Sequence, residues 1–307
     1  MSEIEGNREY LIIAGTPKSG STYLFSLLAA HPSICASAVK ETHYFLSEDH
    51  PLSDTQYNFN KKGIAGFLTF FTPRPQNRFL LEASVQLFSD SDAPQRLQQL
   101  GDCRLIFVLR SPAERLRSSF YFSKNNLALF KKELSFEAFV DCILEDNFDL
   151  FQTYLRKNIS GKILFGELET GHYSKHLTTW QQHFDKNKIY LIQYEKMIQA
   201  KEKMLRALTQ YLGIDTLPTA LFEKANQNAT QAIQANRLHY FIKSLSNKYP
   251  NFLGKTLIKN WYYRFQTKAQ LPSILDDTSA MQRLKAHYQP LNLKLGNYPE
   301  IDLSLWK

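Results

Sequence analysis

The chain has 307 residues, of which 43% are hydrophobic and 21% are charged, and its formal net charge is +8. This length suits one large α/β domain with insertions or two small domains, and the hydrophobic share is sufficient for a substantial core. The basic balance suits an anionic ligand or partner surface, but it does not separate a nucleotide from a nucleic acid or a lipid.

Cysteine usage and the N-terminus exclude several other classes. The three cysteines, Cys35, Cys103 and Cys142, show neither a C-x-x-C pair nor a spacing with histidine that would suit zinc. We therefore expect reduced thiols and no metal site. Residues 1–9 lack the apolar core of a signal peptide, and no apolar run approaches the ~18 residues of a membrane span. We expect a cytoplasmic protein without a transmembrane segment.

Segment 10–28 carries the clearest pattern in the chain. The run Leu11–Ala14 is short and partly β-branched, and Gly15 ends it, so we predict a buried strand. A helix is predicted to begin at Ser21, because serine suits a helix start and leucines follow at helical spacing. Between the two elements, Gly20 allows the loop to turn and to approach a ligand closely.

Further along the chain, short strands alternate with helices. We predict a weak strand at 34–39, strands at 78–84, 103–109 and 188–193, and helices at 93–100, 112–124, 136–145, 173–184, 196–212, 232–246 and 279–294. The helix at 112 has the strongest start signal, since Ser111, Pro112 and Glu114 form a capping box with proline at its first position. Segment 47–78 is expected to be a long loop near the site, with a short helix at 63–71.

Strands that alternate with helices imply right-handed βαβ units and a mainly parallel sheet. We therefore predict an α/β fold, with a central parallel sheet flanked by helices, in a single domain over residues 1–307. Its core spans about 10–215, and a helical or lid region spans about 216–307. The aromatic and basic segment 248–270 suits a lid, stacking on nucleic acid, or simple packing of its rings on the core.

The loop Thr16-Pro17-Lys18-Ser19-Gly20 joins the first strand to the first helix. A loop that leads into a helix N-terminus directs N–H groups and a partial positive charge at a ligand, and Lys18 adds a full charge. Gly15 and Gly20 have the Walker A spacing, but Ser21 follows and the lysine lies inside the loop. The pattern fits a phosphate-binding loop without the ATPase signature; alternatively, the glycines only make the turn.

A lysine inside a T-P-K-S-G-S-T loop directly after the first strand resembles the 5′-phosphosulfate loop of sulfotransferases. These enzymes have a P-loop-like fold and use 3′-phosphoadenosine 5′-phosphosulfate (PAPS). The resemblance implies that Lys18 is catalytic, because it stabilises charge on the oxygen between sulfur and the 5′-phosphate. It also implies a set of loop residues that bind the cofactor phosphate together with Lys18: Ser19, Gly20, Ser21 and Thr22.

A second motif follows the strand at 103–109. Arg110 lies at the carboxyl end of that strand, where ligands bind in open α/β sheets, and its planar guanidinium can bind a phosphate through two hydrogen bonds. Ser118 lies eight residues later on the next helix. This pair resembles the 3′-phosphate-binding segment of sulfotransferases. The alternative is that Arg110 forms a salt bridge and Ser118 is a solvated helix residue.

The segment Lys40-Glu41-Thr42-His43-Tyr44-Phe45 resembles the E-x-x-[FY]-F motif of the carbohydrate, heparan-sulfate-like branch of this family and its soluble bacterial relatives. In that branch the glutamate is the catalytic base, and Glu41 matches it. The cytosolic small-molecule branch uses a histidine, so His43 is the alternative base. The remaining interpretation is that Glu41 is an ordinary solvated loop residue.

Two features depart from that branch. Glu82 is followed by Ala83, where the branch often has a lysine, and no cysteine follows Cys142, where it often has a cysteine pair. The loop that closes over the 3′-phosphate is expected near 224–237, without a specific motif, and its candidate residues are Lys224, Asn226, Asn228 and Arg237.

The resemblance therefore implies a PAPS-dependent sulfotransferase that releases PAP and requires no metal. Transfer is expected to be an in-line displacement in which positioning and electrostatics dominate. The expected acceptor is a hydroxyl, in preference to an amine, of a carbohydrate, glycolipid or lipid-like molecule; we expect no nucleic-acid partner. Two rival functions are a P-loop kinase for a small molecule and a non-enzymatic nucleotide- or nucleic-acid-binding module.

Overall fold

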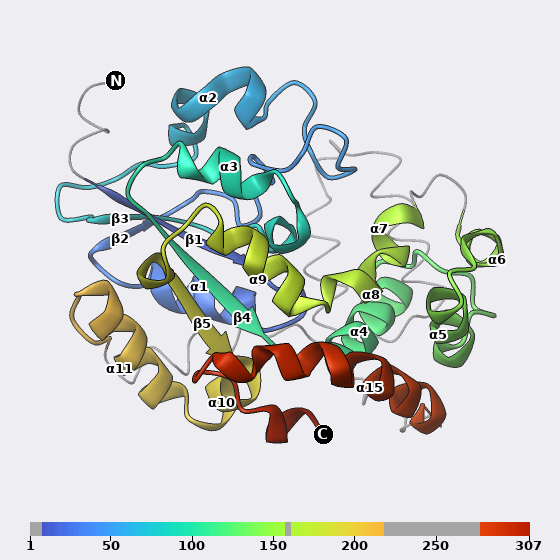
Figure 1. Ribbon diagram of the computed structural model, residues 1–307. Coiled ribbons are helices and arrows are strands. Elements are labelled where there is room, and N and C mark those ends of the chain that lie inside the picture. Colours follow the sequence, from blue (N-terminus) through green and yellow to red (C-terminus); the bar gives the residue numbers. More distant parts are fainter. Residues whose placement is uncertain (1–7, 157–160, 218–276) are drawn as a thin grey trace, which may run out of the picture. The chain divides into compact units, whose positions relative to one another are not determined.

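The computed structural model describes residues 8–156, 161–217 and 277–307 (Figure 1). These residues divide into two compact units. The first unit comprises 8–115, 166–217 and 285–307, and the second comprises 116–156, 161–165 and 277–284. The prediction of a single domain stays a prediction.

A sheet of five parallel strands organises the first unit, in the order β2-β3-β1-β4-β5. The strands are β1 (Glu9–Gly15), β2 (Ile34–Ala36), β3 (Phe79–Glu82), β4 (Cys103–Leu109) and β5 (Ile189–Gln193). The central strand β1 pairs with β3 on one side and β4 on the other. All parallel strands end at the same edge, so the segments after β1, β3 and β4 emerge side by side. The predicted α/β fold with a parallel sheet is confirmed.

Helices cover both faces of the sheet, because alternate residues of each central strand point to opposite sides. Leu11 and Ile13 pack in one apolar cluster, and Ile12 and Ala14 pack in the other. The first face is covered by α1 (Ser21–Ala29), α10 (Tyr194–Gln199) and α11 (Lys201–Leu212). The second face is covered by α2 (Phe59–Leu68), α3 (Ala93–Gln98) and α9 (Tyr173–Gln181) (Figure 1).

Shorter elements complete the first unit: η1 (Val85–Ser89), α8 (Glu167–Thr170), η3 (Lys186–Lys188), η4 (Lys294–Asn297) and η5 (Leu303–Trp306). Trp306 and Leu295 join the same apolar cluster as α9, so the C-terminal segment belongs to the core of this unit. Two longer helices, α4 (Pro112–Tyr121) and α15 (Thr278–Leu293), each contribute residues to both units.

The second unit has an aromatic core. It contains α5 (Phe136–Leu144), α6 (Phe148–Thr153), α7 (Gly161–Phe165) and the π-helical turn η2 (Phe122–Asn126). The rings of Phe120 and Phe139 stack with centroids 5.0 Å apart, and Phe130 and Phe151 pack beside them at 5.5–6.1 Å.

Most predicted elements are present with small shifts in their bounds. The helix predicted at 63–71 begins earlier, at Phe59, because the Asn58 side chain accepts a hydrogen bond from the N–H of Lys61 and caps it. The helix predicted at 196–212 is two helices, since Ala200 is non-helical between α10 and α11. The short helices α6, α7 and α8 were not predicted. Segments 224–237, 232–246 and 248–270 lie outside the described residues.

Among the described residues, no helix combines the length and apolar character needed to cross a bilayer.

Candidate active site

The loop after β1 has the backbone shape that its sequence predicts. Gly20 adopts a left-handed conformation (φ 84°), and a Cβ at this position would lie 2.8 Å from the Met197 side chain. The left-handed backbone favours glycine here, whereas the nearest atom is the terminal methyl of Met197, a flexible side chain that can shift. Helix α1 begins directly afterwards at Ser21, so its first N–H groups face the end of the loop. The turn followed by a helix start is the backbone arrangement expected from the sequence, and the binding of an anion there stays a prediction.

The hydroxyl of Ser19 has a structural role. It lies 2.7 Å from the Thr16 hydroxyl, and Thr16 in turn donates to the main-chain oxygen of Val108 on β4 at 2.9 Å. Both side chains are fully buried. Ser19 can therefore offer a ligand its backbone N–H rather than its hydroxyl. The side chain of Ser21 is also buried, whereas that of Thr22 is exposed.

Lys18 lies in a charged and partly desolvated position. Burial is the main reason that the pKa of Lys18 falls from 10.5 to about 8, and the nearby Arg110 guanidinium lowers this pKa further. The carboxylates of Glu167 and Glu41 act in the opposite direction. The structure therefore brings Lys18, Arg110 and Glu41 into one electrostatic environment, although they are far apart in sequence. An anionic ligand here would relieve the repulsion between the two cations.

Arg110 is bound to the loop that carries Lys18. Its Nη1 donates to the main-chain oxygen of Lys18 at 3.1 Å, and its guanidinium lies 4.9 Å from the centre of the Tyr194 ring. Its Nη2 is 3.8 Å from a carboxylate oxygen of Glu114. The salt bridge that was the alternative role for Arg110 is therefore present, although it is long. The Arg110 side chain retains 20% exposure, which leaves part of its fork accessible to a phosphate.

The peptide group after Arg110 is held at both ends. Tyr173 of α9 donates to the Arg110 carbonyl at 2.7 Å, and Glu195 of α10 accepts from the Ser111 N–H at 2.8 Å. A carboxylate distant in sequence thus takes the place that the capping box assigned to Glu114. Trp306 donates to the other oxygen of Glu195, which links the C-terminus to this strand end. These residues were not predicted, because no local sequence pattern marks them.

Ser118, the second residue predicted to contact the 3′-phosphate, is half-buried on α4. It belongs to the second unit, whereas Arg110 belongs to the first. The assignment of this serine to the phosphate stays a prediction.

The segment that carries both candidate bases follows β2 and turns sharply. Glu41 and His43 both adopt positive φ angles, 63° and 56°. The Glu41 carboxylate lies 2.5 Å from the Lys40 ammonium and stays about one-third exposed. His43 is more enclosed: its Nδ1 is buried without a hydrogen-bond partner among the described residues, and burial lowers its pKa. The lowered pKa keeps the His43 imidazole neutral at pH 7, so it can accept a proton.

The end of β3 holds this segment in place through side chains and backbone. The buried Glu82 Oε1 accepts hydrogen bonds from the N–H and hydroxyl of Thr42, at 3.1 and 3.0 Å, and from Ser84 at 2.5 Å. Ser84 also accepts from the His43 N–H at 2.9 Å, and the Glu41 N–H donates to the Ala83 carbonyl. Residues 82–84, noted in the sequence only as a departure from the family pattern, thus position residues 41–43, which we call the base segment.

The Glu82 carboxyl group is fully buried, and its Oε2 has no hydrogen-bond partner among the described residues. Burial raises the pKa of Glu82, although the hydrogen bonds from Ser84 and Thr42 lower it in part. Glu82 is the last residue of β3, a strand next to β1. Because ligands bind at the carboxyl ends of such strands, this position could have indicated a role for Glu82 in the site.

The sequence and the fold were compared with those of known proteins. A family model described as "Sulfotransferase domain" matches residues 8–279. Human heparan sulfate glucosamine 3-O-sulfotransferase 3A1 is 23% identical over 296 residues, covering 94% of this chain and 61% of the relative. Rat carbohydrate sulfotransferase 15 is 23% identical over 310 residues, covering 87% of this chain and 53% of the relative. The chain thus spans less than two thirds of the length of these curated relatives.

Among solved structures, a sulfotransferase from Alicyclobacillus acidocaldarius superposes with a TM-score of 0.65 at 18% identity, covering 97% of this chain and 98% of that one. That similarity establishes the fold. The family model extends over most of the sequence and includes Lys18, Glu41 and Arg110. The resemblance predicted from the loop after β1 is therefore confirmed, and the chain belongs to the sulfotransferase family.

Proposed function

We propose that this protein transfers a sulfo group from PAPS to a hydroxyl group, in preference to an amine, of a carbohydrate, glycolipid or lipid-like acceptor. The observation that carries the proposal is the convergence of Lys18, Arg110 and Glu41 at one edge of the sheet. The carbohydrate part rests on the relatives, whose names specify heparan sulfate and carbohydrate sulfotransferases.

The residues present fit a donor with two phosphate groups. The turn at Gly20 and the start of α1 provide N–H groups for one anionic group, and Lys18 stands beside them. The accessible part of the Arg110 fork provides a second cationic contact. Two cations held close together at a strand edge are costly without an anion, and this favours a ligand of high negative charge.

PAPS supplies a sulfo group on the 5′-phosphate, and the acceptor loses a proton as its oxygen forms the new bond to sulfur. Within the chain, Glu41 is the proposed base, because its carboxylate is partly exposed and acts electrostatically on Lys18. His43 is the alternative base. Lys18 is the proposed electrostatic stabiliser of charge that develops on the departing oxygen. Glu82 and Ser84 act on the base segment by positioning it.

The test compares ligands and then activity. In a thermal-shift series, PAP is expected to raise the melting temperature, whereas ATP with Mg²⁺ and a short DNA duplex are not. Transfer of labelled sulfate from PAPS is then measured on a panel of hydroxyl-bearing glycans, glycolipids and amino sugars. Stabilisation by ATP with Mg²⁺ alone would instead support a kinase, and stabilisation by DNA alone would support a nucleic-acid-binding module. Cytoplasmic location remains part of the proposal.

A further inference from the structure

A cavity in the first unit shares none of its lining residues with the site described above. It has a volume of about 790 Å³ and lies between helix α9, the start of β5 and the C-terminal segment 291–300. We call it the α9 pocket. Its size falls within the ~300–1,000 Å³ range of small-molecule sites. Neither the phosphate loop nor the segment with Glu41 contributes to it.

Lysines from three elements line the α9 pocket: Lys175 on α9, Lys186 on η3 and Lys294 on η4. Lys175 is paired with Glu169, but Lys186 and Lys294 make no salt bridge with any residue that the structure describes. Glu300 is the one carboxylate among the described lining residues. The pocket therefore has an excess of positive charge, and two of its ammonium groups are available to an anion.

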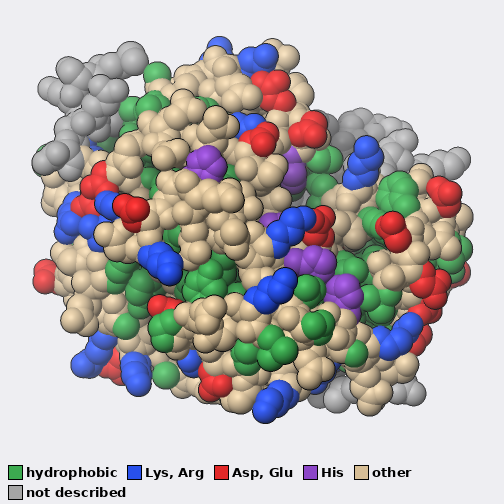
Figure 2. Space-filling view, in the orientation of Figure 1, with side chains coloured by type: hydrophobic (Ala, Val, Ile, Leu, Met, Phe, Trp, Pro, Cys, Tyr) green, Lys and Arg blue, Asp and Glu red, His purple; other side chains and the backbone are tan. Residues whose placement is uncertain are grey.

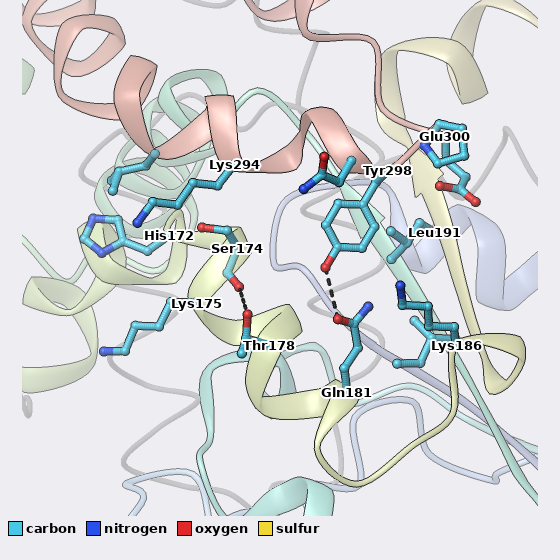
Figure 3. Close-up of a pocket in the computed structure, with 14 residues that line it drawn as sticks. His172, Ser174, Lys175, Thr178, Gln181, Lys186, Leu191, Lys294, Tyr298 and Glu300 are labelled. Carbon is cyan, nitrogen blue, oxygen red and sulfur yellow. Dashed lines mark hydrogen bonds between the residues drawn. The ribbon is translucent and has the colours of Figure 1, made fainter.

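The two available lysines lie at opposite ends of the pocket. Figure 3 shows Lys294 extending towards Ser174 and His172, and Lys186 lying at the other end near Leu191. Between them lies the ring of Tyr298, whose hydroxyl donates to Gln181 at 3.2 Å. Figure 2 shows this face with lysine and histidine side chains around hydrophobic ones. The pocket thus combines two cationic ends, hydroxyl and amide groups, and a flat aromatic surface.

This combination matches the chemistry of a charged sugar. Sulfate and carboxylate groups pair with lysine, sugar hydroxyls bond to amide and hydroxyl side chains, and the C–H face of a sugar ring packs on an aromatic ring. We propose that the α9 pocket binds a segment of anionic glycan that carries two sulfate or carboxylate groups, as a second glycan site outside the reaction centre. This inference rests on the proposed function in one respect, that the acceptor is a carbohydrate.

The test uses binding of a heparin tetrasaccharide, measured by calorimetry with the protein saturated with PAP. The variant Lys186→Glu/Lys294→Glu reverses both available charges, and both positions are exposed, so the fold should persist. The control Lys132→Glu/Lys203→Glu changes the net charge equally at exposed positions outside the pocket. We expect two binding events for wild type and the control, and loss or at least about tenfold weakening of one event in the pocket variant.

Three outcomes would overturn the inference. The first is equal binding by the pocket variant and the control. The second is equal binding at this site of a tetrasaccharide that has been both desulfated and carboxyl-reduced and so carries no charge. The third is equal binding of a DNA oligonucleotide of the same charge. Sulfate transfer to a monosaccharide-sized acceptor should be unchanged in the pocket variant. If no glycan accepts sulfate but the charge-dependent binding event persists, the proposed reaction fails and the pocket assignment stands.

Discussion

The guanidinium of Arg110 donates a hydrogen bond to the main-chain oxygen of Lys18 at 3.1 Å, across 92 positions of sequence. Arg110 directly follows β4 and Lys18 lies in the loop after β1, and these two strands are neighbours in the sheet. The bond fixes the spacing of the two cationic residues proposed to bind opposite ends of the donor. It also means that a change at Arg110 can disturb the loop that carries Lys18.

The first prediction concerns Lys18. The Lys18→Ala variant should transfer sulfate at least about 10²-fold more slowly, since a charge aimed at the developing oxyanion is removed. The rate is measured in single turnovers at saturating PAPS. Lys18→Arg retains the charge and serves as the control for loop structure. Turnover by Lys18→Ala at the wild-type rate would remove the assigned catalytic role.

The second prediction concerns pH. Because burial, with help from Arg110, lowers the pKa of Lys18 to about 8, this side chain loses its charge in the free protein as the pH rises through 8. An anion binds the protonated form better, so the affinity for PAP should fall above pH 8, by up to about tenfold per pH unit. Calorimetry from pH 6.5 to 9.5 measures this dependence. Lys18→Arg should flatten the curve, and an equal slope in that variant would contradict the assignment.

The third prediction concerns Arg110. The Arg110→Ala variant should weaken PAP binding by ~1.5–3 kcal/mol, the contribution of a charge-assisted hydrogen bond. Tyr173→Phe removes a bond to the Arg110 carbonyl without altering the guanidinium, so it should reduce affinity less. Unchanged affinity of Arg110→Ala in calorimetry would show that this side chain does not bind the 3′-phosphate.

The fourth prediction separates the two candidate bases. Glu41→Gln should leave PAP affinity close to the wild-type value and lower turnover by ~10²–10⁴, because proton removal from the acceptor is lost. His43→Ala is the matched comparison on the same segment. If His43→Ala shows the large loss and Glu41→Gln does not, His43 is the base.

The fifth prediction concerns Glu82, which supports the base segment. The pKa of this buried carboxyl group is raised, so the folded state holds its proton more tightly than the unfolded state. Its contribution to stability is therefore fully present below the unfolded pKa near 4.5 and is lost as the pH rises through the higher folded value. Denaturant unfolding from pH 4 to 8 should show this loss in wild type relative to Glu82→Gln.

A further variant tests the positioning role of Glu82. Glu82→Ala leaves the Thr42 donors and Ser84 without their acceptor and should lower turnover more than it lowers PAP affinity. Glu82→Gln keeps an acceptor oxygen and should recover part of the turnover. Identical turnover in all three proteins would show that the base segment does not depend on this carboxyl group.

The local parts of the candidate site could be predicted from the amino-acid sequence alone. The spacing of Gly15, Lys18 and Gly20 predicted the loop, and the apolar run before Arg110 predicted a strand that ends at a ligand-binding edge. These predictions succeeded because a buried parallel strand, a glycine turn and a helix start depend mainly on residues that are adjacent in the chain.

The contacts that hold these parts together could not be predicted and are visible only in the folded chain. The Thr42–Glu82 bonds join positions 40 apart, and the Arg110–Ser111 peptide group is held by Tyr173 and Glu195, 63 and 84 positions away. Such contacts depend on the strand order β2-β3-β1-β4-β5 and on how the helices pack on the sheet. No pattern of neighbouring residues encodes a hydrogen bond between side chains that become neighbours only after the chain has folded.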